Sequence, residues 1–441
     1  MKQKPPRKPK QKRISRKRFP WPLLLALVTG FQLLSAAQVL LRVDEPEWYL
    51  IAALLGYPAL QWGFMIALRI VTKQDRCEPE LLACWLSGIG LTVSASFSTG
   101  FAWRQALAIA GGMVVYAILR WCIADPDRAM KLRPAVAVGA MGLLVLNLAL
   151  ALAAGGNLRW IHLGGFSIQP SELVKIAFVF VGAATLERLQ RTQSILRYLI
   201  FAMACVGALF YMNNFGTALI FFVTFLFIIF MRTGDMRSIA FICAAALMAA
   251  VMILRFRPIV AGRFAVYRQV WDYMHEGGFQ QTRVLIYSSS GGLFGLGIGN
   301  GRLRFIFAAT TDLIFGVIAE EMGLIVAFLI PLCYIGIAIY ALRAAQQARS
   351  SFYTIAAVSA TGLLIFQAAL NIFGITDLLP LTGVTLPFVS RGGTSMLSVW
   401  GMLGFIAALR ESKARKPRKE KDLPLQGIRF ADHAKRQKKQ A

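Results

Sequence analysis

The chain has 441 residues, of which 57% are hydrophobic and only 16% are charged, and its mean hydropathy is +0.59. These values exclude an ordinary water-soluble enzyme. The sequence contains about twelve apolar runs of roughly 17 to 25 residues, the length that a helix needs to cross a hydrocarbon core of about 30 Å. It therefore predicts an all-α polytopic membrane protein with about twelve transmembrane helices.

The expected spans are residues 22–42, 49–71, 82–100, 104–122, 135–154, 171–187, 195–212, 216–231, 238–255, 312–341, 353–375 and 393–409. An even number of spans leaves both tails on the same side of the membrane. Every loop that this topology places inside carries Lys or Arg, whereas the first outer loop carries Asp44, Glu45 and Glu47. By the positive-inside rule, both termini are expected in the cytoplasm.

The formal net charge of +27, from 48 Lys and Arg against 21 Asp and Glu, is concentrated in two basic tails over residues 1–20 and 411–441. Such tails favour the cytoplasmic side and anionic lipid head groups. Nucleic-acid binding is the weaker interpretation, and we expect no nucleic-acid partner. The six cysteines are scattered and include no CxxC pair, so neither a disulfide nor a zinc site is expected.

Ionisable residues inside or at the mouth of a membrane helix are costly, so each is a candidate functional residue. Glu172 and Lys175 lie at i and i+3 in the motif QPSELVK, where they form either a local ion pair or part of a binding site. Asp312 begins the tenth span on its outer side, and it can serve as a helix N-cap or as a general base at the water boundary of a cavity. Glu320 and Glu321 lie deeper and are expected to be structural hydrogen-bond partners.

Two outer segments are unusual. The loop over about residues 256–311 mixes aromatic, apolar and basic side chains, which suits the outer membrane interface. The segment 376–392 is rich in Pro and Gly and cannot be a regular helix at membrane depth. The glycine run at 291–301 lacks the spacing of a phosphate-binding loop, so nucleotide binding is not expected.

Six segments between about residues 82 and 409 together resemble the SEDS family of shape, elongation, division and sporulation proteins. In family order they are GLTVSAS (90–96), NLRWIHLGGFSIQPSELVK (157–175), FGTALI (215–220), SSSGGLFGLGIG (288–299), TDLIFGVIAEEMG (311–323) and LLPLTGVTLPFVSRGGTS (378–395). Gln105 is placed like the glutamine that opens the family's second helix. The resemblance implies a SEDS-like core over residues 82–410, preceded by two additional transmembrane helices within residues 21–81.

The resemblance implies a peptidoglycan glycosyltransferase in the cytoplasmic membrane of a bacterium. Such an enzyme polymerises lipid II, an undecaprenyl-linked disaccharide pentapeptide, into glycan strands at the outer face of the membrane. The implied partner is a class B penicillin-binding protein, with other cell-wall or divisome proteins beside it. The motifs do not distinguish elongation, division and sporulation.

The family's essential aspartate falls on Asp312, which the resemblance implies as the base that accepts a proton from the attacking sugar hydroxyl. The expected substrate-binding residues are Arg159, Trp160, Gln169, Ser171, Glu172, Lys175, Arg263, Gln280, Ser390, Arg391, Gly392 and Gly393. Asn214, Glu320 and Glu321 are expected to be structural. A diphosphate leaving group calls for cations or for a divalent metal such as Mg²⁺ or Mn²⁺, but the sequence contains no metal motif.

The chain departs from the family pattern at several points. It has twelve expected spans where ten are usual, an amide at Asn214 where a carboxylate is usual, and Arg391 in place of a tyrosine. Phe307, Ala308 and Thr310 replace the usual Pro-Glu and His before the aspartate. These changes leave two alternatives open: a non-catalytic SEDS-like scaffold or activator of a penicillin-binding protein, and a lipid II flippase.

Overall fold

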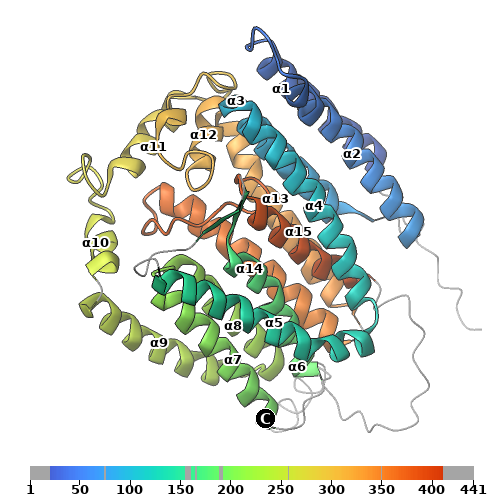
Figure 1. Ribbon diagram of the computed structural model, residues 1–441, viewed down its shortest axis with the longest axis vertical. Coiled ribbons are helices and arrows are strands. Elements are labelled where there is room, and N and C mark those ends of the chain that lie inside the picture. The colour runs from blue at the N-terminus through green and yellow to red at the C-terminus, as the bar shows by residue number, and fades with distance from the viewer. Residues whose placement is uncertain are drawn as a thin grey trace, which may run out of the picture.

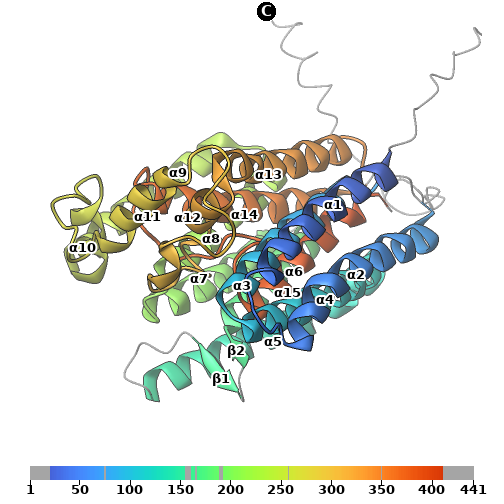
Figure 2. The same ribbon diagram turned by 90° about the horizontal axis from the view of Figure 1, so that it is seen from above.

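The structure is a computed structural model that describes residues 20–410 except 74–75, 154–159, 164–165, 188–191, 257 and 349. Residues 1–19 of the expected tail at 1–20, the whole expected tail at 411–441 and the candidate Arg159 lie outside the described residues. Figure 1 shows long helices that run side by side, with shorter helices gathered at one end of the bundle. Figure 2 shows the same short helices at the same end, seen from above.

The helices in chain order are α1 (Trp21–Leu40), α2 (Trp48–Thr72), α3 (Glu78–Phe97), α4 (Thr99–Ile123), α5 (Pro126–Ala153), α6 (Pro170–Glu187), α7 (Thr192–Tyr211), α8 (Phe215–Thr233), α9 (Met236–Phe256), α10 (Pro258–Val266), α11 (Phe279–Ser290), α12 (Ile314–Glu321), α13 (Gly323–Ala345), α14 (Ser351–Ile375) and α15 (Gly393–Ala408). A short 3-10 helix, η1, covers Leu303–Phe305. Two short antiparallel strands, β1 (Ile161–Leu163) and β2 (Phe166–Ile168), pair in the register His162 with Ser167.

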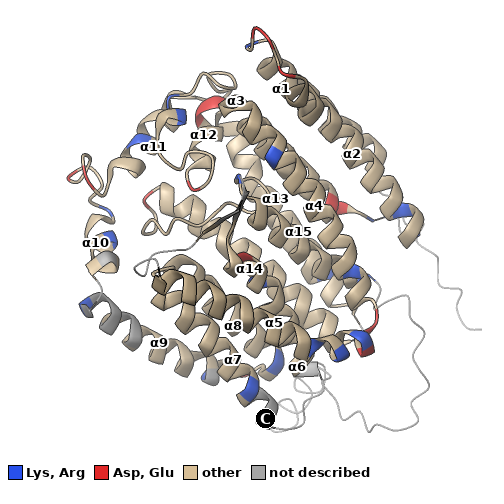
Figure 3. Cartoon of the chain, viewed as in Figure 1, with Lys and Arg blue, Asp and Glu red and all other residues tan. Residues whose placement is uncertain are grey.

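Within the described part of the chain, eight helices are long and apolar enough to cross a membrane: α1 to α5, α8, α13 and α14. Shorter apolar helical stretches cover Leu196–Tyr211, Ile239–Met248 and Gly393–Ala408. Each of the twelve predicted runs coincides with helix, and charged residues lie mostly at helix ends (Figure 3). The prediction of an all-α polytopic membrane fold is confirmed.

The prediction of one continuous span over 312–341 is wrong. The chain forms α12 and α13 with a break at Gly323, whose φ is +87°. A Cβ at this glycine would lie 2.3 Å from the carbonyl oxygen of Leu293, so the glycine run at 291–301 packs directly against the break. The start of α5 is also earlier than predicted, because the basic segment 126–134 is already helical.

The outer segment 256–311, expected as one large loop, contains α10, α11 and η1. Two buried carboxylates hold the end of its glycine run. Glu321 accepts the backbone N–H groups of Gly299 and Gly301 at 2.8 and 3.3 Å. Glu320 accepts those of residues 302 and 303 at 2.6 and 2.9 Å. Each carboxylate therefore satisfies two backbone donors that the loop would otherwise bury unpaired.

The N-terminal helices α1 and α2 lie along α3 and α4, at the outer edge of the bundle (Figure 1). Buried polar contacts join them, since Tyr57 donates a hydrogen bond to the carbonyl oxygen of Cys84 at 2.7 Å. Just after α1, the guanidinium of Arg42 donates to the carbonyl oxygen of Ile298 at 3.3 Å. The additional pair is thus packed on the core and reaches the glycine run.

Helix α15 lies among α4, α6 and α14, and nearly all of its residues are buried. Directly after α15, Arg410 donates to both carboxylate oxygens of the fully buried Glu80 at 3.1 and 2.8 Å. Tyr116 donates to the same carboxylate at 2.7 Å. This network fixes one end of α15, whose other end begins at the site described below.

Candidate active site

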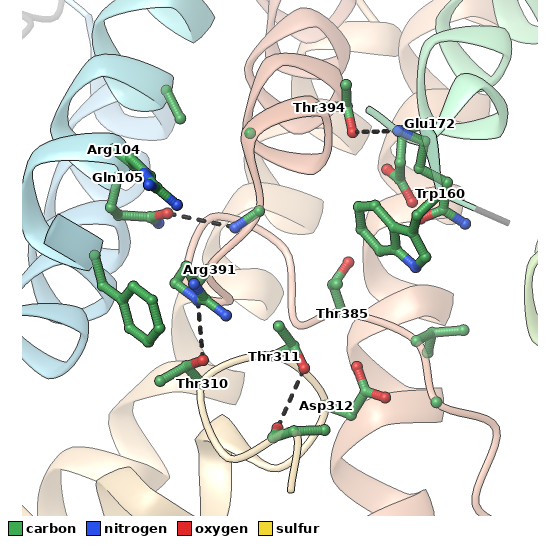
Figure 4. Close-up of a pocket in the computed structure, with 18 of the residues that line it drawn as sticks. Arg104, Gln105, Trp160, Glu172, Thr310, Thr311, Asp312, Thr385, Arg391 and Thr394 are labelled. Carbon is green, nitrogen blue, oxygen red and sulfur yellow. Dashed lines mark hydrogen bonds between the residues drawn. The ribbon is translucent and has the colours of Figure 1, made fainter. Parts of the chain in front are cut away.

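A cavity of about 1190 Å³ opens where α4, the β2–α6 junction, α8, the segment before α12 and the segment between α14 and α15 meet. Figure 4 shows Asp312, Glu172 and Trp160 toward one side of it and Arg104, Gln105 and Arg391 toward the other. The predicted site residues that line it are Trp160, Gln169, Glu172, Lys175, Asn214, Asp312, Arg391, Gly392 and Gly393. Segments more than 200 residues apart in sequence therefore form one site.

Asp312 lies on a tight turn that points its carboxylate into the cavity (Figure 4). The turn closes on the carbonyl oxygen of Ala308, which accepts the backbone N–H groups of Thr311, Asp312 and Leu313 at 3.0 to 3.1 Å. Helix α12 begins only at Ile314, with Leu313 as its N-cap. The interpretation of Asp312 as an N-cap is therefore wrong, and its side chain lines the cavity.

Gly383 keeps space open beside this carboxylate. A Cβ at Gly383 would lie 3.3 Å from Oδ2 of Asp312, and the φ of +69° disfavours any other residue there. From α14, the amide of Asn371 donates to the carbonyl oxygens of Asp312 at 2.8 Å and Val384 at 2.7 Å. One side chain thus ties the aspartate turn to the segment that carries Gly383.

The segment 376–392 is also joined to the turn through Ser390 and Arg391. The hydroxyl of Ser390 donates to the carbonyl oxygen of Thr311 at 2.5 Å and accepts the N–H of Leu386 at 2.7 Å. The backbone N–H of Arg391 donates to the carbonyl oxygen of Thr310 at 2.9 Å. Ser390 is buried and supports the wall, whereas Arg391 lines the cavity.

The predicted ion pair between Glu172 and Lys175 is confirmed, with Nζ of Lys175 2.8 Å from Oε1 of Glu172. Nζ also donates to the side-chain oxygen of Gln367 at 2.9 Å, and Gln367 donates in turn to the carbonyl and hydroxyl oxygens of Thr385 at 2.9 and 3.0 Å. The hydroxyl of Thr385 is 2.9 Å from that of Ser395. The pair is therefore the start of a buried polar network behind the cavity wall.

One carboxylate oxygen of Glu172 has no protein partner. This oxygen, Oε2, is buried and has no hydrogen-bond partner. The hydroxyl of the adjacent Ser171 is also buried and has no hydrogen-bond partner. Gln169 is held through its backbone N–H, which donates to the hydroxyl of Thr394 at 3.1 Å. On the opposite wall the backbone N–H of Gly392 donates to the side-chain oxygen of Gln105 at 3.4 Å.

Four predicted site residues do not line the cavity and instead hold neighbouring segments by hydrogen bonds. Arg263 donates to the carbonyl oxygen of Thr382 at 3.2 Å, and Gln280 donates to that of Phe307 at 3.1 Å, so both support the wall from behind. Glu320 and Glu321 hold the glycine run.

Gln367 and Asn371, which are buried in α14, were not among the site residues predicted from the sequence. Their signal was two amides four residues apart within an otherwise apolar span, which places them on one helix face. Because both side chains are uncharged, neither was a candidate among the ionisable residues of the spans.

The described residues include no group of three or more His, Cys, Asp or Glu side chains that could hold a metal ion. Two carboxylates, Asp312 and Glu172, line the cavity. A divalent ion held by them would need further ligands from water or from phosphate oxygens of a substrate, which is a common arrangement for Mg²⁺.

Residues 84–415 match the FtsW, RodA and SpoVE family, described as cell cycle protein. The chain belongs to this family. The match confirms the SEDS resemblance, and it begins inside α3, after the two additional helices. The chain is therefore a multi-pass bacterial membrane protein. Two findings support this: its apolar helices and its membership in the FtsW, RodA and SpoVE family.

The chain is 26% identical over 430 residues to the peptidoglycan glycosyltransferase RodA of Mycobacterium leprae, which covers 89% of this chain and 90% of that relative. It is 31% identical over 260 residues to the stage V sporulation protein E of Bacillus subtilis, covering 57% of this chain and 71% of that relative. A solved chain from a peptidoglycan synthase complex matches with a TM-score of 0.61 at 22% identity, over 76% of this chain and 97% of that one. This FtsW, RodA and SpoVE family member therefore shares its fold with a solved chain of a peptidoglycan synthase complex.

Proposed function

We propose that the protein is a peptidoglycan glycosyltransferase that polymerises lipid II into glycan strands. The observation that carries the proposal is the carboxylate of Asp312, which lines a cavity between the Glu172–Lys175 pair and the arginines of the opposite wall. The activity is also the one named for the RodA protein of Mycobacterium leprae. Elongation, division and sporulation all draw on this reaction.

In the proposed reaction, the carboxylate of Asp312 accepts the proton of the 4-hydroxyl of a lipid-linked disaccharide. The hydroxyl oxygen forms the new glycosidic bond to the anomeric carbon of the growing chain. The bond from that carbon to the diphosphate oxygen breaks, and undecaprenyl diphosphate leaves. The turn on Ala308 and the bond from Asn371 hold the base at a fixed position, which lowers the entropic part of the barrier.

A divalent ion such as Mg²⁺ or Mn²⁺ remains part of the proposal. Asp312 and the unpartnered Oε2 of Glu172 are the oxygens that would hold it, together with substrate phosphate oxygens. When bound, such an ion would supply positive charge toward a developing diphosphate.

The proposed reaction takes place at the outer face of the cytoplasmic membrane, with both termini in the cytoplasm, as the loop charges indicate. The proposed partner is a class B penicillin-binding protein. The solved chain with the same fold comes from a complex that coordinates polymerization and crosslinking, and this supports a crosslinking partner here.

The test is polymerisation of labelled lipid II by the purified full chain, alone and with the class B penicillin-binding protein of its own bacterium. Asp312→Asn should abolish polymer formation, because an amide cannot accept the proton, whereas Asp272→Asn on the exposed outer segment should leave it unchanged. Polymer from Asp312→Asn at the wild-type rate would remove this base from the mechanism. Absence of polymer from the wild type would favour the scaffold, and movement of lipid II across vesicles without polymer would favour the flippase.

A further inference from the structure

Two arginines face the cavity on the wall opposite Glu172. Arg104 lies near the start of α4 and is exposed, and Arg391 lies just before α15 and is half-buried. The guanidinium of Arg391 is 3.6 Å from the centre of the Phe101 ring and donates from Nε to the hydroxyl of Thr310 at 3.0 Å. Its position is therefore fixed by a ring on one side and by the aspartate turn on the other.

The charge of this arginine pair is not neutralised by the protein. In the described part of the chain, no carboxylate lies within salt-bridge distance of Arg104 or Arg391. Burial lowers the pKa of Arg391 below its ordinary value, and the positive charge of Arg104 acts in the same direction. Two like charges held near each other at a partly desolvated wall favour an anion between them.

The two other cations that line the described cavity, Lys175 and Arg304, make contacts of their own. Lys175 is paired with Glu172, and Arg304 donates to the carbonyl oxygens of Gly299 and Ser96 at 2.9 and 3.1 Å. Lys175 is thus neutralised by a carboxylate and Arg304 is directed toward two backbone carbonyl oxygens, which leaves the arginine pair facing the cavity.

The wall next to the pair is apolar. Leu107 and Ala108 follow Arg104 by one turn of α4, and Leu397 follows from α15. Leu107 is 43% exposed. A ligand with an anionic head and a hydrocarbon tail fits a cationic patch beside an apolar one. Its head would contact the guanidinium groups, and its tail would contact the neighbouring leucines.

We propose that Arg104 and Arg391 together bind the diphosphate of the lipid-linked glycan donor, the group that leaves in the reaction. This assignment rests on the proposed glycosyltransferase function. Two guanidinium forks can engage both phosphates of a diphosphate, whereas a monophosphate can fully occupy only one of them. Arg391 is held to Thr310, two residues before Asp312, so the bound diphosphate lies next to the segment that carries the base. Arg391 stands where the family pattern has a tyrosine, so this chain has one more cation for the leaving group.

The test measures the dissociation constants of undecaprenyl diphosphate and undecaprenyl phosphate for the full chain in nanodiscs of uncharged lipid. The wild type should prefer the diphosphate. Arg391→Gln and Arg104→Gln should each weaken diphosphate binding about tenfold or more and affect monophosphate binding less. Arg391→Lys keeps the charge but not the fork and should lose less affinity than Arg391→Gln.

The matched control is Arg283→Gln, which removes the same charge from α11 outside the cavity and should bind as the wild type does. The double variant Arg104→Gln with Arg391→Gln should lose less than the sum of the two single losses if both residues bind one diphosphate. Thermal unfolding of each variant checks the fold.

Wild-type affinity in both arginine variants, or an equal loss in Arg283→Gln, would overturn the assignment. A failure of the proposed glycosyltransferase function can be distinguished from a failure of the diphosphate assignment. If the wild type makes no polymer from lipid II but binds the diphosphate through both arginines, the subsite stands and the glycosyltransferase does not.

Discussion

The backbones of Gly90 and Val389 touch. A Cβ at Gly90 of α3 would lie 2.1 Å from the carbonyl oxygen of Val389, which directly precedes Ser390, Arg391 and Gly392 of the cavity wall. Gly90→Ala should therefore push this segment away from α3 and displace the arginine. We expect polymerisation to fall by about 100-fold, the effect of a displacement of roughly 1 Å at a site, measured with labelled lipid II.

The control for this glycine is Gly142→Ala in α5, where nothing lies within 4 Å of the added methyl group. There the substitution should stabilise the helix by up to about 1 kcal/mol and leave the rate unchanged. Equal rates for Gly90→Ala and the wild type would mean that the segment shifts without disturbing the site.

Asn371 is a positioning residue, because it holds the carbonyl oxygen of Asp312 and does not line the cavity. Asn371→Ala removes both of its donated bonds, so the aspartate turn and the Val384 segment can separate. We expect kcat to fall about tenfold or more with little change in KM, since the base is displaced while the substrate contacts remain. The measurement is steady-state polymerisation over a range of lipid II concentrations.

Gln281→Ala, in α11, is the control, because it removes another buried amide that donates a hydrogen bond to α14. Its buried amide donates to the carbonyl oxygen of Gly374 at 2.9 Å, in contact with the same helix but not with the aspartate turn. Both variants should lower the unfolding temperature, and only Asn371→Ala should lower kcat. If kcat falls equally in the two variants, Asn371 contributes only to the stability of the fold and does not position the base.

Lys175 is almost fully buried, and its charge is balanced by Glu172. Lys175→Met leaves that carboxylate buried without its partner, which should cost about 3 kcal/mol of stability. The double variant with Glu172→Gln removes both charges and should unfold at a higher temperature than Lys175→Met alone. Thermal unfolding of the two variants side by side tests this order, and the reverse order would show that the pair is not electrostatically coupled.

Local spacing explains which parts of the site could be predicted from the sequence. Glu172 and Lys175 are three residues apart on one helix, so their ion pair follows from helix geometry alone. Gln367 joins the same network from 192 residues away, and no local pattern specifies that contact. The apolar runs likewise predicted the helices, because length and hydropathy are local properties.

Two predictions from the sequence were wrong, and in both cases tertiary contacts override the local pattern. The run 312–341 is apolar enough for one span, yet Gly323 breaks it because the glycine run at 291–301 packs there. Asp312 resembles an N-cap by its position, but the turn on Ala308 delays the helix to Ile314. Both wrong predictions fall in the segment that carries the proposed base. There the chain departs from regular helix, and its turn lines the cavity.

The orientation of the bundle can be tested with a single engineered cysteine. His275 is exposed between α10 and α11, at the end of the bundle that we propose to be outside. His275→Cys, in a background without Cys243 and Cys122, should react with a membrane-impermeant maleimide in intact cells. Gly278 is unsuitable, because a Cβ there would lie 2.5 Å from the carbonyl oxygen of Val270.

The matching inner position is Asp127, exposed in the first turn of α5 and followed by basic residues. Asp127→Cys should react only after the cells are opened, because the positive-inside rule places this turn in the cytoplasm. Labelling of the two positions in the opposite order would put the aspartate cavity on the cytoplasmic side. The sugar acceptor of the proposed reaction would then have to be reached from inside, and the mechanism at the outer face would fail together with the topology.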